Sequence, residues 1–174
     1  MNHQPRAEGV FSKHVARSLA LVDPDLLACF ADLVGGVERW PLFLYGPPGT
    51  GKTCAALALT DHVNGSWYET AGNLAHRHAA EITGRGSAVQ WDRFTPSDKH
   101  GSYRLVVLDE LGLRKQVSDS HYEAVHKVLD CRDGYPLIII SNIDGDGLAG
   151  LYDARIADRI MAGTQFQLTG KSRR

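Results

Sequence analysis

The chain has 174 residues, of which 43% are hydrophobic and 22% charged, and these fractions are typical of globular proteins. The length allows one domain with a sizeable core and is too short for two ordinary domains. The formal net charge is −1, so an anionic partner has to be bound by a local basic patch. The three cysteines are an odd number without a CxxC pair, which argues against a disulfide framework and against a zinc site.

The distribution of apolar residues bears on the location of the protein. The first twenty residues carry no apolar run of the kind that a signal peptide needs. The longest apolar stretches have the length of a strand, well below the roughly 20 residues that span a bilayer. We therefore expect a soluble cytoplasmic protein with no membrane partner.

Two short helices are predicted before the core. Apolar residues recur at helical spacing over residues 10–21. Asp23 followed by Pro24 is typical of a helix start, and this second helix should run to about Val34, before a glycine pair. We expect residues 1–39 to form a short helical N-terminal extension to a core of residues 40–174.

In the core, predicted strands alternate with predicted helices. Strands are expected at residues 41–45, 66–70, 104–109, 137–141 and 164–168, and helices at residues 52–63, 73–82, 118–132 and 152–161. Glycine, proline and polar residues predict a long loop at residues 83–102. Several strands are apolar throughout, which favours a mainly parallel five-stranded sheet covered by helices on both faces, a three-layer α/β/α fold.

The loop between the first strand and the following helix carries a phosphate-binding pattern. It reads Gly46-Pro47-Pro48-Gly49-Thr50-Gly51-Lys52-Thr53 and matches G-x-x-x-x-G-K-[ST] at every fixed position. The glycines let successive backbone N–H groups turn inward and form an anion-binding nest at a helix N-terminus. Lys52 would reach the β- and γ-phosphates, and the Thr53 hydroxyl would ligate Mg²⁺. The pattern predicts a nucleoside triphosphate site, for ATP rather than GTP because no guanine-reading N-K-x-D motif occurs.

Two adjacent acids stand at the end of the strand predicted at residues 104–109. Asp109 and Glu110 would lie at the carboxyl edge of the sheet, where ligands bind in open α/β folds. We expect Asp109 to hold Mg²⁺ and Glu110 to act as the general base on the attacking water. Adjacent carboxylates in these roles favour hydrolysis over phosphoryl transfer. Asn142, at the end of the next strand, is a candidate for orienting water or the γ-phosphate, although an asparagine there is often only a turn residue.

These motifs together resemble those of a known family. Residues 46–53, 105–110, Ser141-Asn142 and 155–159 resemble the AAA+ ATPases with the P-loop NTPase fold, and within them the DnaC/IstB group of helicase loaders and transposition helper ATPases. The resemblance covers roughly residues 40–172, including a C-terminal stretch at 168–172. It implies that Arg155 is the arginine finger that completes the site of a neighbouring subunit. Arg159, one turn on, is the second candidate, and a surface salt-bridge helix with Asp153 and Asp158 is the alternative to both.

The resemblance also implies self-association and a partner in DNA metabolism. The leading hypothesis is a DnaC-type ATPase that acts on DNA, single-stranded DNA being favoured, with a replicative helicase as partner in replication. An IstB-like ATPase, which acts with a transposase, is the alternative. A small-molecule kinase and a nucleotide switch that does not hydrolyse ATP stay open. Only some 40 residues precede the first core strand, and we expect no helical lid domain after the last.

A mildly basic interval is the local evidence for nucleic acid. Its basic residues are His76, Arg77, His78, Arg85, Arg93, Lys99, His100 and Arg104, and residues 171–174 add further charge. Trp91 and Phe94 in the same interval could stack on bases. An ordinary solvated loop with one buried aromatic residue explains the composition equally well.

Overall fold

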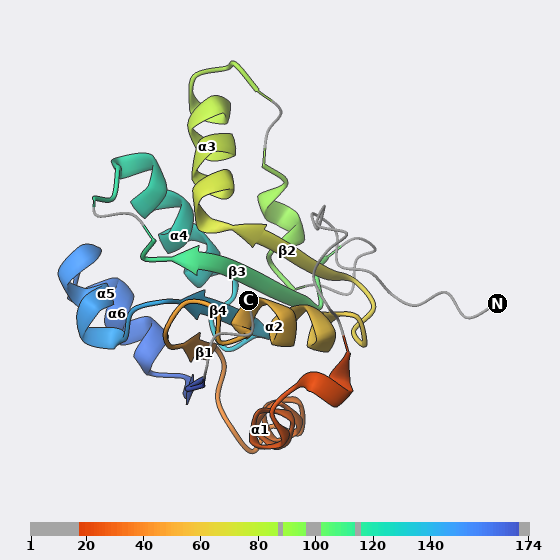
Figure 1. The fold of residues 1–174 in the computed structure, drawn as a ribbon. Helices are drawn as coiled ribbons and strands as arrows, with labels where there is room; N and C mark the ends of the chain where they lie inside the picture. Colours follow the sequence, from red (N-terminus) through yellow and green to blue (C-terminus); the bar gives the residue numbers. More distant parts are fainter. Residues whose placement is uncertain (1–17, 87–88, 97–101, 114–115, 171–174) are drawn as a thin grey trace.

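The structure, a computed structural model, describes residues 18–86, 89–96, 102–113 and 116–170. Within them, five strands form one sheet in the order β2-β3-β4-β1-β5, and every adjacent pair is parallel (Figure 1). The strands are β1 (Leu42–Tyr45), β2 (Ser66–Thr70), β3 (Leu105–Leu111), β4 (Leu137–Ser141) and β5 (Thr164–Gln167). The parallel five-stranded α/β fold predicted from the sequence is confirmed.

Helices cover both faces of the sheet, as Figure 1 shows. The helices are α1 (Pro24–Val34), α2 (Lys52–Thr60), α3 (Ala71–Ile82), α4 (Asp119–Cys131), α5 (Gly145–Leu151) and α6 (Ala154–Met161), with 3-10 turns η1 (Leu19–Leu21) and η2 (Trp91–Arg93). One apolar core joins α1 and α2 to the sheet face that carries Leu42 and Leu44. The other joins α3, α4, α5 and α6 to the face that carries Phe43. Because successive residues of a strand point to opposite faces, a strand between two cores has to be apolar throughout.

Several elements differ from their predicted bounds. The helix α5 was not predicted, since Gly145, Gly147 and Gly150 lower its helix propensity, but Asp144 caps it by accepting from the backbone N–H of Gly147 at 2.9 Å. The strand β3 continues two residues past Asp109. Of the first predicted helix, residues 10–17 lie outside the described residues and Leu19–Leu21 form a 3-10 turn.

The order of the strands brings three loop regions to one edge of the sheet. Because all five strands are parallel, their carboxyl ends share one edge. Here β1 leads into the glycine-rich loop and α2, while β3 and β4 end beside it. In the part of the chain that the structure describes, no helix has both the length and the apolar character needed to cross a bilayer.

Candidate active site

The glycine-rich loop joins β1 to the N-terminus of α2, as predicted. Gly46 has φ +140°, and a Cβ atom at this position would lie 2.1 Å from the backbone oxygen of Leu168, just after β5. The position therefore requires glycine. Gly51, with φ +94°, precedes Lys52, the first residue of α2. The loop thus delivers the helix N-terminus, with its unpaired N–H groups, to the carboxyl edge of the sheet.

Lys52 is buried and donates hydrogen bonds within its own loop. Its Nζ lies 2.7 Å from the backbone oxygen of Gly46 and 2.8 Å from that of Pro47. Burial lowers the pKa of Lys52, and the negative charge of Asp109 opposes this effect. The ammonium group is therefore held by neutral carbonyl oxygens, which an anionic group can replace with a stronger charge-assisted interaction.

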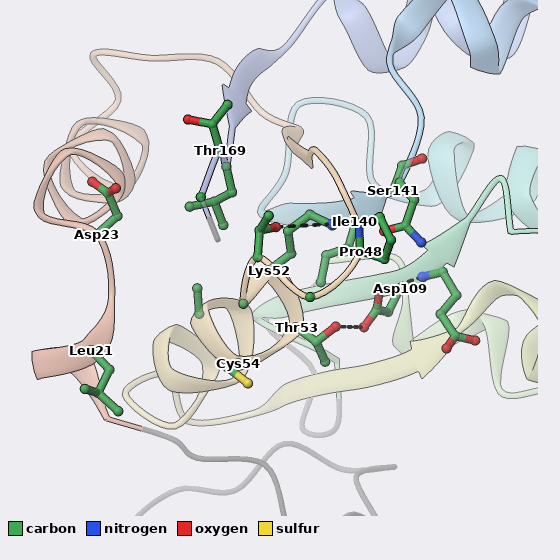
Figure 2. Close-up of a pocket in the computed structure, with 18 of the residues that line it drawn as sticks. Leu21, Asp23, Pro48, Lys52, Thr53, Cys54, Asp109, Ile140, Ser141 and Thr169 are labelled. Atoms are coloured by element: carbon green, nitrogen blue, oxygen red, sulfur yellow. Dashed lines mark hydrogen bonds between the residues drawn. The ribbon is translucent and has the colours of Figure 1, made fainter. Parts of the chain in front are cut away.

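Asp109 is the centre of a hydrogen-bond cluster that links three elements. It is 3% exposed, and its Oδ2 accepts from Thr53 Oγ1 at 2.7 Å and from the Tyr68 hydroxyl at 2.8 Å (Figure 2 shows the Thr53 contact). Thr53 lies on α2 and Tyr68 on β2. Burial, and after it the charge of Asp109, raise the pKa of Tyr68, so the phenol keeps its proton and acts as the donor. Tyr68 was not predicted as a site residue.

Glu110 lies on a bulge in β3. Leu108 pairs with Ile139 and Leu111 with Ser141, so two residues of β3, Asp109 and Glu110, lie opposite the single residue between them on β4. Glu110 has φ +59°, a conformation that is uncommon outside glycine and is found at functional sites. As a result Asp109 is buried while Glu110 is exposed at the carboxyl edge.

The ends of β3 and β4 are tied together beside Glu110. Ser141 Oγ donates to the backbone oxygen of Leu111 at 2.8 Å and accepts from the backbone N–H of Ile143 at 3.0 Å. This arrangement gives Ser141 a structural role that the sequence did not suggest. Asn142, which lies between Ser141 and Ile143 in the sequence, is exposed and lines the same cavity as the glycine-rich loop.

A cavity of about 910 Å³ collects these side chains, a size suited to a nucleotide. Figure 2 shows the loop at its centre, with Leu21 and Asp23 on one side and Asp109 and Ser141 on the other. Its lining residues are Ser18, Leu21, Asp23, Pro48, Gly49, Thr50, Gly51, Lys52, Thr53, Cys54, Ala55, Asp109, Glu110, Leu113, Ile140, Ser141, Asn142, Leu168, Thr169 and Gly170. The structure thus brings the predicted loop, both acids and Asn142 to one cavity.

The donor set in this cavity fits a small, hard cation that is shared with a phosphate group. The Thr53 hydroxyl donates a hydrogen bond to Asp109, so the lone pairs of the Thr53 oxygen remain available to a metal. Magnesium is usually held by one or two protein oxygens, with water and substrate phosphates completing its shell. Thr53 and Asp109 could supply such a pair.

Comparison with known proteins identifies the family. Residues 42–144 match the model of the ATPase family associated with various cellular activities (AAA). This match spans more than half of the chain and includes the loop, both acids and Asn142. The chain belongs to the AAA family.

Sequence relatives of this AAA chain include subunits of replication factor C. The replication factor C large subunit of Methanothrix thermoacetophila is 44% identical over 71 residues, 40% of this chain and 14% of the relative. The large subunit of Archaeoglobus fulgidus is 30% identical over 108 residues, 59% of this chain and 22% of the relative. The chain therefore spans less than a quarter of the length of these relatives.

Solved structures with the same fold include a DnaI and a replication initiator, DnaA. The structure of a DnaI has a TM-score of 0.73 at 18% identity, covering 97% of this chain and 99% of that one. A replication initiator DnaA bound to AMPPCP and single-stranded DNA has a TM-score of 0.66 at 19% identity, covering 86% of this chain and 47% of that one. At these identities the likeness establishes the fold alone.

The two arginines of the AAA chain's α6 lie outside the cavity lining and differ in their surroundings. Arg159 forms a hydrogen-bonded ion pair with Asp130 of α4. Arg155 is exposed, one turn earlier on the same helix. It lies beside Asp153, whose carboxylate caps α6 by accepting from the backbone N–H of Ile156 and also accepts from the Tyr122 hydroxyl.

The prediction that Trp91 and Phe94 stack on bases is wrong for Phe94 of this AAA chain. Phe94 is 2% exposed and packs edge-on against Trp67 in the core. Trp91 is half-buried, donates to Glu81 at 3.1 Å and has the Lys127 ammonium 4.4 Å from its ring centre. Phe94 cannot stack on a base without leaving the core. The predicted basic residues Lys99, His100 and 171–174 lie outside the described residues.

Proposed function

We propose that this chain is an ATP-binding and ATP-hydrolysing AAA+ protein of the DnaC type, whose nucleotide state controls assembly on DNA or on a DNA-bound partner in replication. One observation carries the proposal: Lys52, Thr53, Asp109, Glu110 and Asn142 line one cavity at the carboxyl edge of the sheet. In this proposal Lys52 and Thr53 serve triphosphate binding. Hydrolysis in addition needs a base and a polar orienting group beside the phosphates, and Glu110 and Asn142 would supply these.

Each residue has a chemical task in this proposal. Lys52 leaves the carbonyl oxygens of its loop and binds the β- and γ-phosphates. Thr53 and Asp109 would hold Mg²⁺, which when bound neutralises phosphate charge. Glu110 takes the proton of the attacking water, and Asn142 orients that water or the γ-phosphate.

A small-molecule kinase needs no general base for water beside its metal-holding acid. Here Glu110 lies directly beside Asp109 and is exposed toward the cavity by the bulge in β3. This placement supports hydrolysis over phosphoryl transfer to a second substrate. A nucleotide switch without turnover would share the binding residues, so the distinction rests on a measured rate.

The names of the similar proteins support a role in replication. They include subunits of replication factor C and a DnaA bound to single-stranded DNA. We propose accordingly that the chain acts with DNA and a replicative helicase. An affinity-tagged chain, incubated with ATP and a purified replicative helicase or a purified transposase, should retain the helicase. Retention of the transposase instead would favour the IstB-like alternative.

The Lys52→Ala substitution tests the binding claim. Loss of a charge-assisted contact to phosphate should weaken ATP binding by about 10- to 100-fold, measured by titration calorimetry. Lys127→Ala is the matched control, because Lys127 lies over the Trp91 ring and outside the cavity lining. Unchanged ATP affinity in Lys52→Ala would contradict the proposed nucleotide site.

A further inference from the structure

The buried carboxylate of Asp109 is held from several directions. Its Oδ1 accepts from the backbone N–H of Glu110 at 2.6 Å. Its Oδ2 accepts from Thr53 at 2.7 Å and from Tyr68 at 2.8 Å. A carboxylate that is 3% exposed needs such donors, because a buried charge without hydrogen bonds is strongly destabilised.

The register of the sheet explains how Tyr68 reaches Asp109. On the parallel pair of β2 and β3, Tyr68 lies opposite Val107, and Asp109 follows Val107 by two residues. Residues two apart on a strand point to the same face of the sheet. A diagonal neighbour on the next strand lies within reach of a long aromatic side chain, so the tyrosine hydroxyl spans the gap.

The Thr53 hydroxyl depends in turn on Asp109. A hydroxyl group has one proton and two lone pairs, and the Thr53 hydroxyl uses its proton in the hydrogen bond that it donates to Asp109. This contact turns the lone pairs of Thr53 away from Asp109. If the carboxylate rotated, Thr53 would lose the acceptor that fixes its orientation. Tyr68 and Thr53 therefore donate to the same oxygen, Oδ2 of Asp109. Of these two residues, Tyr68 does not lie in the cavity lining.

We propose that Tyr68 is a positioning residue for the metal site: its hydroxyl fixes the rotamer of Asp109, and through Asp109 the orientation of Thr53, for a divalent cation bound with ATP. The inference rests on the proposed nucleotide function. Partners outside the first ligands of a metal commonly change its affinity by about 10- to 100-fold when they are removed.

The test is the substitution Tyr68→Phe, which removes the hydroxyl and keeps the ring that packs against the core of α1 and α2. Binding of a fluorescent N-methylanthraniloyl ATP is measured in excess MgCl₂ and in EDTA. The factor by which Mg²⁺ tightens binding should fall about 10-fold from its wild-type value, while the affinity in EDTA stays within about twofold.

Tyr122→Phe is the matched control. The Tyr122 hydroxyl also donates to a carboxylate, that of Asp153 at 2.7 Å, but neither residue lines the cavity. This variant should keep the wild-type effect of Mg²⁺. A second variant, Tyr68→Leu, removes the ring as well and should lose the Mg²⁺ effect to at least the same extent.

The outcomes separate this inference from the proposed function. If wild-type protein shows no nucleotide binding, the proposed function fails and the inference fails with it. If wild-type protein binds and responds to Mg²⁺ but Tyr68→Phe responds equally, only the role of Tyr68 is overturned. Tighter Mg²⁺-dependent binding in Tyr68→Phe would also overturn it, since the hydroxyl would then compete with the metal for Asp109. A parallel loss of affinity in EDTA would mark Tyr68 as a structural residue only.

Discussion

Glu110 combines an unusual backbone conformation with an unusual electrostatic setting. Its φ of +59° costs on the order of 1–3 kcal/mol for a residue other than glycine. Although the side chain is exposed, its partial desolvation at the strand end, and after it the charge of Asp109, raise the pKa of its carboxyl group. Both features occur at one strand end, where the bulge in β3 coincides with two adjacent acids. A base benefits from a raised pKa, because its proton affinity then approaches what proton abstraction from water requires.

Glu110→Gln should separate ATP binding from ATP hydrolysis. The amide keeps the size and polarity of the side chain but cannot accept a proton from water, so kcat should fall by about 100-fold or more. The affinity for ATP should change little, because Lys52 and the loop are intact. Phosphate release and equilibrium ATP binding are measured on the same preparation. Turnover at the wild-type rate would contradict the role of Glu110 as the base.

The raised pKa of Glu110 also predicts the direction of a pH effect on turnover. The base works in its ionised form, and that fraction decreases as the pH falls through its pKa. This pKa lies above the ordinary glutamate value of 4.5. The ATPase rate at saturating MgATP should therefore decline on acidification before pH 4.5 is reached. A rate that stays constant down to that pH in folded protein would contradict this assignment.

The sequence predicted those residues of the candidate site that follow one another in recognisable order, and it missed those that depend on the register of the sheet. The loop residues and both acids are contiguous, so their chemistry could be recognised from spacing alone. Tyr68 contributes through a diagonal contact between β2 and β3, and no local pattern indicates which strand will lie beside β3. The prediction for Phe94 was wrong for a related reason. An aromatic residue in a polar interval can face either the solvent or the core, and tertiary packing determines which of the two it faces.

Among the elements, the end of α4 is tied to the segment before β3 by one buried side chain. Arg132, 1% exposed, donates to the backbone oxygens of four residues, namely Phe94, Tyr103, Arg104 and Pro136. Burial lowers the pKa of Arg132 to about 10, so the side chain remains charged at neutral pH. The planar guanidinium can reach several carbonyl oxygens at once, which a lysine ammonium cannot match.

Arg132→Met should destabilise the fold without changing the cavity. The substitution keeps an unbranched side chain but leaves buried carbonyl oxygens without donors, which should lower the free energy of unfolding by about 2–4 kcal/mol. Urea unfolding followed by circular dichroism measures the change. Arg85→Met is the control, because Arg85 is exposed and should shift stability by no more than about 0.5 kcal/mol. Equal stability of the two variants would refute the structural role of Arg132.

Element prediction succeeded where hydrophobic periodicity was strong. The strands β2 and β4 have the predicted bounds, because apolar runs are local signals. The helix α4 begins close to its predicted start, where Ser118 caps it. The helix α5 was missed because its glycines are typical of loops, while its position is stabilised by Leu148, which is fully buried in the core. The bulge in β3 was missed because it depends on pairing with β4, which a single strand does not reveal.

At the scale of the whole molecule, the cavity holds the proposed binding groups and the proposed base, but among the residues that the structure describes its lining contains no arginine. The AAA resemblance assigns that missing charge to Arg155 of a neighbouring subunit. In this chain Arg155 is exposed on α6, while Arg159 is paired with Asp130 of the same chain. An exposed arginine is available to a neighbour, whereas a paired one has to break its ion pair first. This contrast favours Arg155 over Arg159 as the finger.

Arg155→Ala should still bind ATP. If the arginine acts as a finger on the transition state, the rate of ATP hydrolysis should fall by about 1,000-fold or more. Mixing it with Lys52→Ala should restore activity, because each variant supplies what the other lacks across a head-to-tail interface. With random assembly at equal amounts, about a quarter of the interfaces pair an intact loop with an intact arginine. ATPase activity of the mixture should therefore approach a quarter of the wild-type value.

Arg159→Ala is the matched control for this experiment, since it removes an arginine from the same helix that is tied to Asp130. It should lower stability slightly and retain most of the ATPase activity when tested alone. Assembly of each mixture is followed by light scattering, so that loss of the oligomer is not mistaken for loss of the finger. An assembled mixture of Arg155→Ala and Lys52→Ala that stays inactive would refute action in trans. Inactivity of Arg159→Ala, with rescue by Lys52→Ala, would transfer the role to Arg159.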